Sequence, residues 1–261
     1  MNVFILTDLE GIAGIDSIEQ MDRKGDEYLS SREKLTYSLN VAIDACINNG
    51  AENVYFLDGH GGGGNVIDDI TDKRAKKCTI NEWETLIKEG KIDCQIELGS
   101  HARAGTTGGF LDHTISSRSI FCIKINGREF SEVALHAALC GKFGVPVVAV
   151  TGDETSCEQT KEYIPEIYTG AVKKATFRNN AQTYDNSDEI LIETISNALK
   201  NYRDIPLFKV AEPMEVEYCY YRTDMCEDAI KKNPTAFRKD ARTVVKTVNE
   251  IKGYDDFRFI Q

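Results

Sequence analysis

The first third of the chain alternates continuous apolar runs with an amphipathic stretch. Residues 2–8 form an apolar run that ends at an aspartate, and such runs are typical of strands buried on both faces. Apolar residues recur at helical spacing from Leu35 to Ile47, and Asn48-Asn49-Gly50 then marks a helix end. Residues 54–57 return to strand character. This order predicts a β-α-β unit with a right-handed parallel crossover.

The same alternation continues to about residue 202. We predict that the first helix begins near Ser30, because Ser30 and Glu33 have the spacing of a capping box. Asn126-Gly127 is a strong signal for a tight turn. Further helices are predicted at 81–88, 132–143, 157–163 and 188–202, and further strands at 92–98, 120–125, 145–151 and 170–177. The pattern predicts an α/β fold with a mostly parallel sheet and helices on both faces.

The pattern changes after Pro206. Two predicted strands, at 214–221 and 242–248, alternate with predicted helices at 223–232 and 249–257. We therefore expect a main α/β domain over residues 1–205. Residues 206–261 are expected to form a smaller C-terminal α+β segment that could cap a site.

Composition narrows the function classes. The 261 residues carry 31 Lys and Arg against 42 Asp and Glu, a net charge of −11, which argues against a nucleic-acid partner. The eight cysteines are scattered without a C-x-x-C pair, as expected for reduced thiols of a cytoplasmic protein. The N-terminus enters a strand directly, so we expect no secretory signal. No apolar segment approaches the roughly 20 residues of a membrane span. We therefore expect no membrane partner.

Candidate metal ligands stand at the ends of predicted strands. Asp8 and Glu10 are two residues apart, so on a strand they project to one side, and two close carboxylates repel unless a cation lies between them. His60 and His101 follow the next runs. Ligand sites of parallel α/β sheets lie beyond the carboxyl ends of the strands. We therefore expect these four side chains to converge on a metal.

The donor set suggests which metal and how many ions. Imidazole and carboxylate ligands suit zinc, at about 2.0–2.2 Å, and Mn²⁺ or Co²⁺ would accept the same ligands. With Glu132 as a further candidate there are too many ligands for one tetrahedral ion. Two ions roughly 3.5–4 Å apart, as in two-metal hydrolases, would use all five if one carboxylate were shared. Asp8 is the natural bridge.

An ordered set of motifs resembles the M55 family of zinc D-aminopeptidases. The motifs are Asp8-Leu9-Glu10-Gly11, Asp58-Gly59-His60, Gly99 to Ala104, His113, the Glu132 segment, and Val145 to Asp153. The resemblance runs from about residue 1 to about residue 178 and is fainter beyond. It implies that Asp8, Glu10, His60, His101 and Glu132 bind two zinc ions with Asp8 shared, and that His113 is the catalytic histidine.

The resemblance also suggests an activity. It implies an aminopeptidase acting on short peptides with N-terminal D-residues such as D-Ala, and a closed ring-like homo-oligomer, with a decamer as its suggested size. A loop histidine with a pKa near neutrality suits proton transfer, and we assign that role to His113. The chain is one residue longer than the family pattern between His101 and His113, at residues 107–109.

Other readings stay open at this point. A metal-dependent phosphoesterase or another amidohydrolase could use the same ligands, and a peptide-binding sensor could keep a structural metal. His136, one helical turn after Glu132, is expected to be structural or to support the ligands. Asp153 or Glu154 could bind a substrate ammonium, and Arg103 could hold a carboxylate or form an ion pair.

Overall fold

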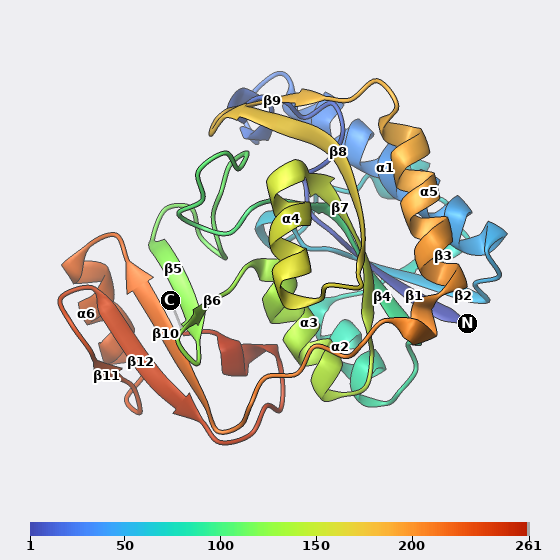
Figure 1. Cartoon of the computed structure of the whole chain (residues 1–261). Coiled ribbons are helices and arrows are strands. Elements are labelled where there is room, and N and C mark those ends of the chain that lie inside the picture. Colours follow the sequence, from blue (N-terminus) through green and yellow to red (C-terminus); the bar gives the residue numbers. More distant parts are fainter. Residues whose placement is uncertain (260–261) are drawn as a thin grey trace.

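The protein is built around two sheets of different character. A computed structural model describes residues 1–259 (Figure 1). The main sheet has seven strands in the order β3-β2-β1-β4-β7-β8-β9, and all pairings are parallel except that between β8 and β9. Its strands are β1 (Asn2–Thr7), β2 (Asn53–Asp58), β3 (Ala75–Lys77), β4 (Cys94–Ser100), β7 (Val147–Asp153), β8 (Tyr168–Phe177) and β9 (Asn180–Thr183).

Helices cover both faces of this sheet, as the apolar pattern predicts. Figure 1 shows α1 (Tyr28–Asn48) and α5 (Ser187–Lys200) above the sheet, where they pack against each other. On the other face lie α2 (Ile80–Lys88), α3 (Glu132–Lys142) and α4 (Glu154–Tyr163). The central strands between these layers are the most buried: β1 is buried at every residue but its first, and β4 and β7 are buried at every residue. The α/β prediction with helices on both faces is confirmed.

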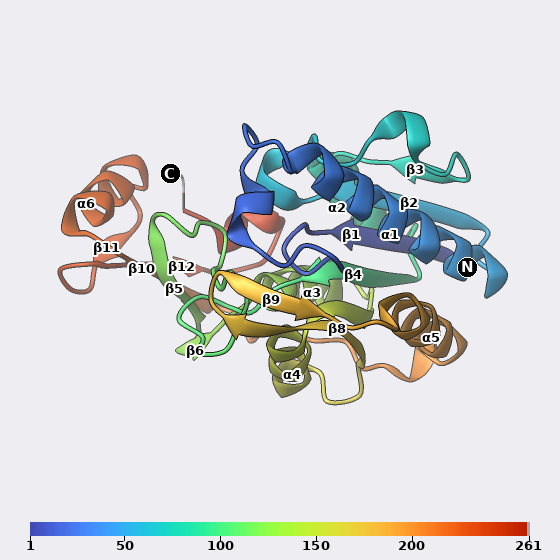
Figure 2. The same cartoon turned by 90° about the horizontal axis from the view of Figure 1, so that it is seen from above.

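A second, five-stranded sheet lies beyond the carboxyl ends of the main strands (Figures 1 and 2). Its order is β11-β12-β10-β5-β6, and all its pairings are antiparallel. The elements are β5 (Ile120–Ile125), β6 (Arg128–Glu129), β10 (Met214–Tyr220), α6 (Thr223–Lys232), β11 (Phe237–Arg238) and β12 (Thr243–Val248). Strands from the middle of the chain therefore share a sheet with the C-terminal segment.

This arrangement bears on the expected division at residue 205. The strand at 120–125 and the turn at Asn126-Gly127 are present, and both turn residues have positive φ, 51° and 78°. The hairpin pairs with β10 of the later segment instead of joining the main sheet. The division into 1–205 and 206–261 stays a prediction, and residues 260 and 261 lie outside the described residues.

Two local predictions are wrong. Helix α1 begins at Tyr28, so Ser30 and Glu33 lie inside it and do not cap it. The Tyr28 hydroxyl donates a hydrogen bond to Asn65, which anchors the first residue of the helix. The helix expected at 249–257 is reduced to a 3-10 turn at Tyr254–Phe257. The Asp256 carboxylate accepts hydrogen bonds from the amides of Lys252 and Gly253, which holds the preceding segment in a non-helical conformation.

All eight cysteines are free. Within residues 1–259, every helix is too short or too polar to cross a bilayer.

Close backbone contacts fix the ends of β4 and β7. A β-bulge lies at Gly99, whose φ is +84°, and a bulge of this kind redirects the residues that follow. Next to it, a Cβ added to Gly152 would lie 1.9 Å from the carbonyl oxygen of Ser100. The chain can therefore turn out of β4 toward His101 only where a glycine faces it on β7.

We expect Gly152→Ala to destabilise the fold by about 1–3 kcal/mol, the usual cost of overpacking a close-packed interior. The added methyl group meets backbone, which cannot move aside without shifting β4 against β7. Chemical denaturation of the substituted protein measures the change in unfolding free energy. An unchanged free energy would mean that the two strands separate without cost.

Candidate metal centre

The candidate ligands meet at the point where the order of strand addition to the sheet reverses. β1 and β4 are neighbours, but the chain leaves β1 toward β2 on one side and later adds β4 on the other. The connecting helices α1 and α2 lie on opposite faces, so a crevice opens at the carboxyl ends of β1 and β4, the usual ligand site of such sheets. Asp8 and Glu10 follow β1, and His101 follows β4.

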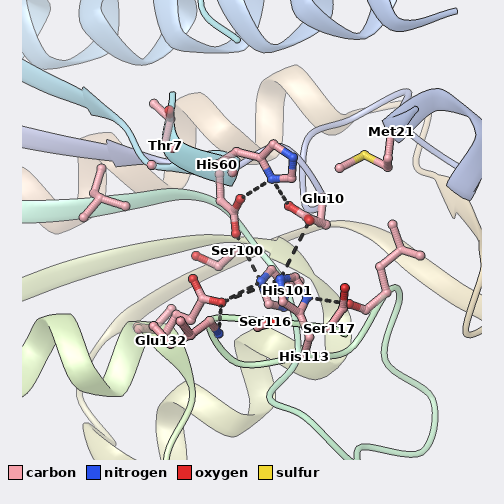
Figure 3. A pocket seen from close by; sticks show the side chains of 18 of the residues that line it. Thr7, Glu10, Met21, His60, Ser100, His101, His113, Ser116, Ser117 and Glu132 are labelled. Atoms are coloured by element: carbon pink, nitrogen blue, oxygen red, sulfur yellow. Dashed lines mark hydrogen bonds and ion pairs between the residues drawn. The ribbon is translucent and has the colours of Figure 1, made fainter. Parts of the chain in front are cut away.

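Figure 3 shows the side chains of Glu10, His60, His101, His113 and Glu132 pointing toward one another. Asp8, Glu10 and His60 form a first group of possible ligand atoms, all within 4.8 Å of each other. His60 Nδ1 lies 3.2 Å from Asp8 Oδ1 and 2.9 Å from Glu10 Oε2. Two carboxylates thus share one imidazole nitrogen.

His101, His113 and Glu132 form a second group of the same size. Glu132 Oε1 lies 3.5 Å from His101 Nε2 and 3.7 Å from His113 Nε2. The amide of Ile115 donates to the same oxygen at 2.7 Å, which holds the carboxylate in place. The two imidazole rings stack with centroids 4.0 Å apart and planes 5° from parallel.

Asp8 connects the two groups. Its Oδ1 faces His60, while its Oδ2 lies 3.2 Å from His101 Nε2. The amide of Leu9 donates to Oδ1 at 2.8 Å and orients the carboxylate. Each oxygen of one carboxylate therefore faces a different group, the geometry expected of a bridging ligand.

Backbone carbonyls orient two of the histidines. Nδ1 of His101 donates to the carbonyl of Ala102 at 2.9 Å, and Nδ1 of His113 donates to that of Leu111 at 2.8 Å. Since a carbonyl only accepts hydrogen bonds, both rings present Nε2 to the carboxylates. Such outer hydrogen bonds commonly fix the tautomer of metal-binding histidines.

Opposite charges in the crevice shift one another's pKa. Burial raises the pKa of the Asp8 carboxyl, but hydrogen bonds from His101 and His60 outweigh it and hold that pKa well below its usual range. Burial also opposes ionisation of Glu132, yet the hydrogen bond from His101 lowers the pKa of Glu132 to about 2. Asp8 and Glu132 are therefore ionised at neutral pH.

The histidines respond in the opposite direction. Burial lowers the pKa of His60, but the charges of Glu10 and Asp8 raise it to about 11. His101 is likewise buried, and hydrogen bonds to Asp8 and Glu132 hold its pKa well above the usual value. Protons on two imidazoles thus balance the carboxylates. A divalent cation would supply the same compensation with nitrogen and oxygen donors that suit zinc, so the residues fit a metal.

We expect metal binding at pH 7 to release about two protons per chain, because His60 and His101 must be neutral to act as ligands. Metal affinity should rise about tenfold per pH unit for each displaced proton, and the contribution of His60 should persist up to its pKa of about 11. Calorimetric titration in two buffers of different ionisation enthalpy measures the release. Binding heats that do not depend on the buffer would contradict the expected proton release.

The candidate ligands line a cavity of about 1110 Å³. His136 lines it but lies outside both groups: its Nδ1 donates to Glu97 Oε2 at 3.2 Å, and the Tyr254 hydroxyl lies 3.2 Å from its Nε2. The sequence predicts a structural or supporting role for His136, in agreement with these contacts. Tyr254 connects the C-terminal part of the chain to the wall of the cavity.

The predictions for a substrate-ammonium site and for Arg103 have different outcomes. Asp153 is fully buried, caps α4 by accepting from the Ser156 amide at 2.7 Å, and does not line the cavity. Glu154 also lies outside the cavity wall and pairs with Lys174 at 3.3 Å, so neither carboxylate supports the expected ammonium site. Arg103 pairs with Glu129 and Glu162, which confirms the ion-pair alternative.

Sequence reasoning missed the residues that support the ligands. The Asp58 carboxylate accepts from the amides of Asn65 and Val66 at 2.6 and 2.9 Å, and Asn65 donates to the carbonyl of His60 at 2.7 Å. These bonds hold the glycine-rich loop that carries His60. The position of Asp58 at a strand end, two residues before His60, is the signal that could have identified it.

Comparisons with known proteins extend these observations. The family model Peptidase_M55, described as D-aminopeptidase, matches residues 1–257. A D-aminopeptidase of Bacillus subtilis (strain 168) is 28% identical over 231 residues, which cover 85% of this chain and 82% of the relative.

A solved structure has the same fold. It is that of the Zn-dependent D-aminopeptidase DppA from Bacillus subtilis, described as a self-compartmentalizing protease. The two structures align with a TM-score of 0.90 and 24% identity, covering 96% of this chain and 92% of that one. Because the family match spans nearly the whole sequence, the chain belongs to the M55 family of D-aminopeptidases and is a metallo-aminopeptidase.

Proposed function

We propose that the protein is a dinuclear zinc aminopeptidase that removes N-terminal D-residues such as D-Ala from short peptides. The observation that carries the proposal is the pair of ligand groups joined by the two oxygens of Asp8. Zinc is supported by the mixed imidazole and carboxylate donors and by the Zn-dependent relative. Mn²⁺ or Co²⁺ would fit the same donors.

The residues divide into holding and proton-moving roles. Glu10 and His60 would hold one ion, His101 and Glu132 the other, and Asp8 both. When bound, zinc ions act as Lewis acids that activate water and polarise the scissile carbonyl. The carboxylates and imidazoles also define where the free amine of the peptide must lie, next to the two groups.

His113 is our candidate for moving the proton. Its Nδ1 is committed to the Leu111 carbonyl, and its Nε2 lies 4.0 Å from Glu10 Oε1 and 3.7 Å from Glu132 Oε1, between the two groups. A proton taken up at Nε2 can be delivered to the leaving amine nitrogen. The additional residue at 107–109 does not prevent this placement.

The cavity wall supports a substrate with a free carboxylate. In a chain of net charge −11, the wall nevertheless carries Arg23, Lys24, Arg118, Arg178 and Arg258. The Arg178 guanidinium is committed to Asp112 at 2.8 Å. Among residues 1–259, the Arg118 side chain makes no hydrogen bond or ion pair with another residue, so it is available for the C-terminal carboxylate of a dipeptide.

We expect Arg118→Ala to raise KM for a dipeptide about tenfold, the effect of losing one charge-assisted hydrogen bond from an exposed side chain, worth about 1.4 kcal/mol. The kcat value should change little. As a control, the same dipeptide with a C-terminal amide should give equal KM values for the wild type and the substituted enzyme. A tenfold difference that persists with the amide would assign Arg118 another role.

Assembly is a further part of the proposal. The relative is described as self-compartmentalizing, and we propose that this chain also forms a closed ring-like homo-oligomer. Light scattering after size exclusion should give a multiple of the chain mass, with ten copies as the expected size. A monomer would contradict the proposal.

Turnover of matched substrates tests the activity. We expect the zinc-loaded enzyme to release D-alanine from D-Ala-D-Ala at a higher kcat/KM than it releases L-alanine from L-Ala-L-Ala. Phosphodiesters are included because a basic cavity wall would also suit a phosphoesterase. Cleavage of phosphodiesters without cleavage of either dipeptide would overturn the aminopeptidase proposal.

A further inference from the structure

A fully buried lysine lies beneath the loop that carries Asp8 and Glu10. Lys173 is in the middle of β8 and has no exposed surface, whereas the side chain of its neighbour Lys174 is 63% exposed. Burying an ammonium group costs several kcal/mol unless it is well bonded. An apolar side chain would fill the same space without that cost.

The ammonium group of Lys173 bonds to the metal-binding loop itself. It donates to the carbonyl of Glu10 at 2.8 Å and also to the carbonyl of Ile15. Lys173 is 163 residues away from Glu10 in sequence. The two bonds close the loop after β1 across its base.

The same ammonium group also reaches the loop that leads to His113. It lies 4.9 Å from the centroid of the Phe110 ring, within the range of a cation–π contact. Phe110 is fully buried and precedes Leu111, whose carbonyl orients His113. Lys173 thus lies between two of the loops that supply the site, although it does not line the cavity.

The position of the Glu10 carboxylate depends on its backbone. Its Oε2 lies 2.9 Å from His60, and its Oε1 lies 4.0 Å from His113. Metal sites tolerate little displacement of a ligand, and loss of an outer partner that positions one typically lowers metal affinity 10–100-fold. Without the bond from Lys173, the Glu10 carbonyl would be held less firmly, and its side chain with it.

We propose that Lys173 is a positioning residue for the first ligand group, Asp8, Glu10 and His60, through its bond to the backbone of Glu10. The inference rests on the proposed dinuclear function. It makes a selective prediction: the first group should lose metal affinity when Lys173 is replaced, while the group of His101 and Glu132 should keep it.

The test is a metal titration of Lys173→Met against a chromophoric chelator. Methionine fills the space of the lysine stem but cannot donate a hydrogen bond. We expect wild-type protein to bind two metal equivalents, and Lys173→Met to bind one equivalent with wild-type affinity and the second 10–100-fold more weakly. Lys174→Met is the matched control on the same strand and should bind both as the wild type does.

The outcomes separate this inference from the proposed function. If the wild type binds two equivalents and Lys173→Met binds both as tightly, the positioning role is overturned and the dinuclear site stands. If Lys173→Met weakens the affinity for both metal equivalents equally and lowers the thermal unfolding midpoint, Lys173 has only a structural role, and the positioning role is overturned. Fewer than two equivalents in the wild type would overturn the dinuclear proposal itself.

A second variant covers the case in which Lys173→Met does not fold. Lys173→Arg keeps a charge and several donors, and we expect it to bind both equivalents within about threefold of the wild type if the hydrogen bonds are what matters. A folded Lys173→Arg protein that weakens both equivalents equally would overturn the positioning role.

Discussion

Replacement of His113 by alanine should lower kcat for D-Ala-D-Ala by about 10²–10⁴, the usual contribution of one general acid or base. The metal content should remain that of the wild type. The reason is the placement of Nε2 between Glu10 and Glu132, where it would face a peptide bound at the two ligand groups and could move a proton. Steady-state kinetics and metal analysis of the same preparation measure both quantities.

A different outcome would change the role of His113. Because His113 belongs to the same group of possible ligand atoms as His101 and Glu132, loss of one metal equivalent would make it a ligand. Added imidazole provides a control, since it should restore part of the rate only if a proton carrier is missing. A rate within tenfold of the wild type would contradict the catalytic assignment.

Replacement of Asp8 by asparagine should have the largest effect on metal binding. Each oxygen of Asp8 faces a different ligand group, and the neutral amide would offer one oxygen in place of two ionised ones. We expect both metal equivalents to be weakened and peptidase activity to fall below detection. Glu10→Gln and Glu132→Gln are the matched controls, and each should weaken one equivalent only. If Asp8→Asn also weakens only one, Asp8 is not shared.

Much of the site could be predicted because its residues have a simple relation to the sheet. Asp8, His60 and His101 follow parallel strands of the same sheet, and the carboxyl ends of such strands lie at one edge. The apolar runs that predict the strands therefore also predict which polar residues meet. The M55 resemblance, which the family match extends to residue 257, strengthened Glu132 as a candidate ligand and assigned the catalytic role to His113. The positions of these two residues on a helix and a loop carry no such signal.

Other features depend on contacts that local patterns do not encode. The run at 120–125 reads as a strand, but nothing in its residues indicates that it pairs with β10, almost a hundred residues later. Lys173 stands between apolar and polar neighbours in β8 and reads as an ordinary strand residue. Its role depends on hydrogen bonds to the carbonyls of Glu10 and Ile15, which lie next to Lys173 only in the folded chain. Asp153 likewise reads as a strand-end carboxylate, whereas the fold uses it to cap α4.

The most direct test of the account is to count zinc ions per chain in active enzyme and follow D-Ala-D-Ala cleavage as each ion is removed by chelation. We expect two zinc ions per chain, with cleavage of the D-peptide lost on chelation and restored when zinc is returned. One zinc ion per chain with full activity would contradict a dinuclear site. Two zinc ions with no cleavage of D-peptides would contradict the proposed reaction.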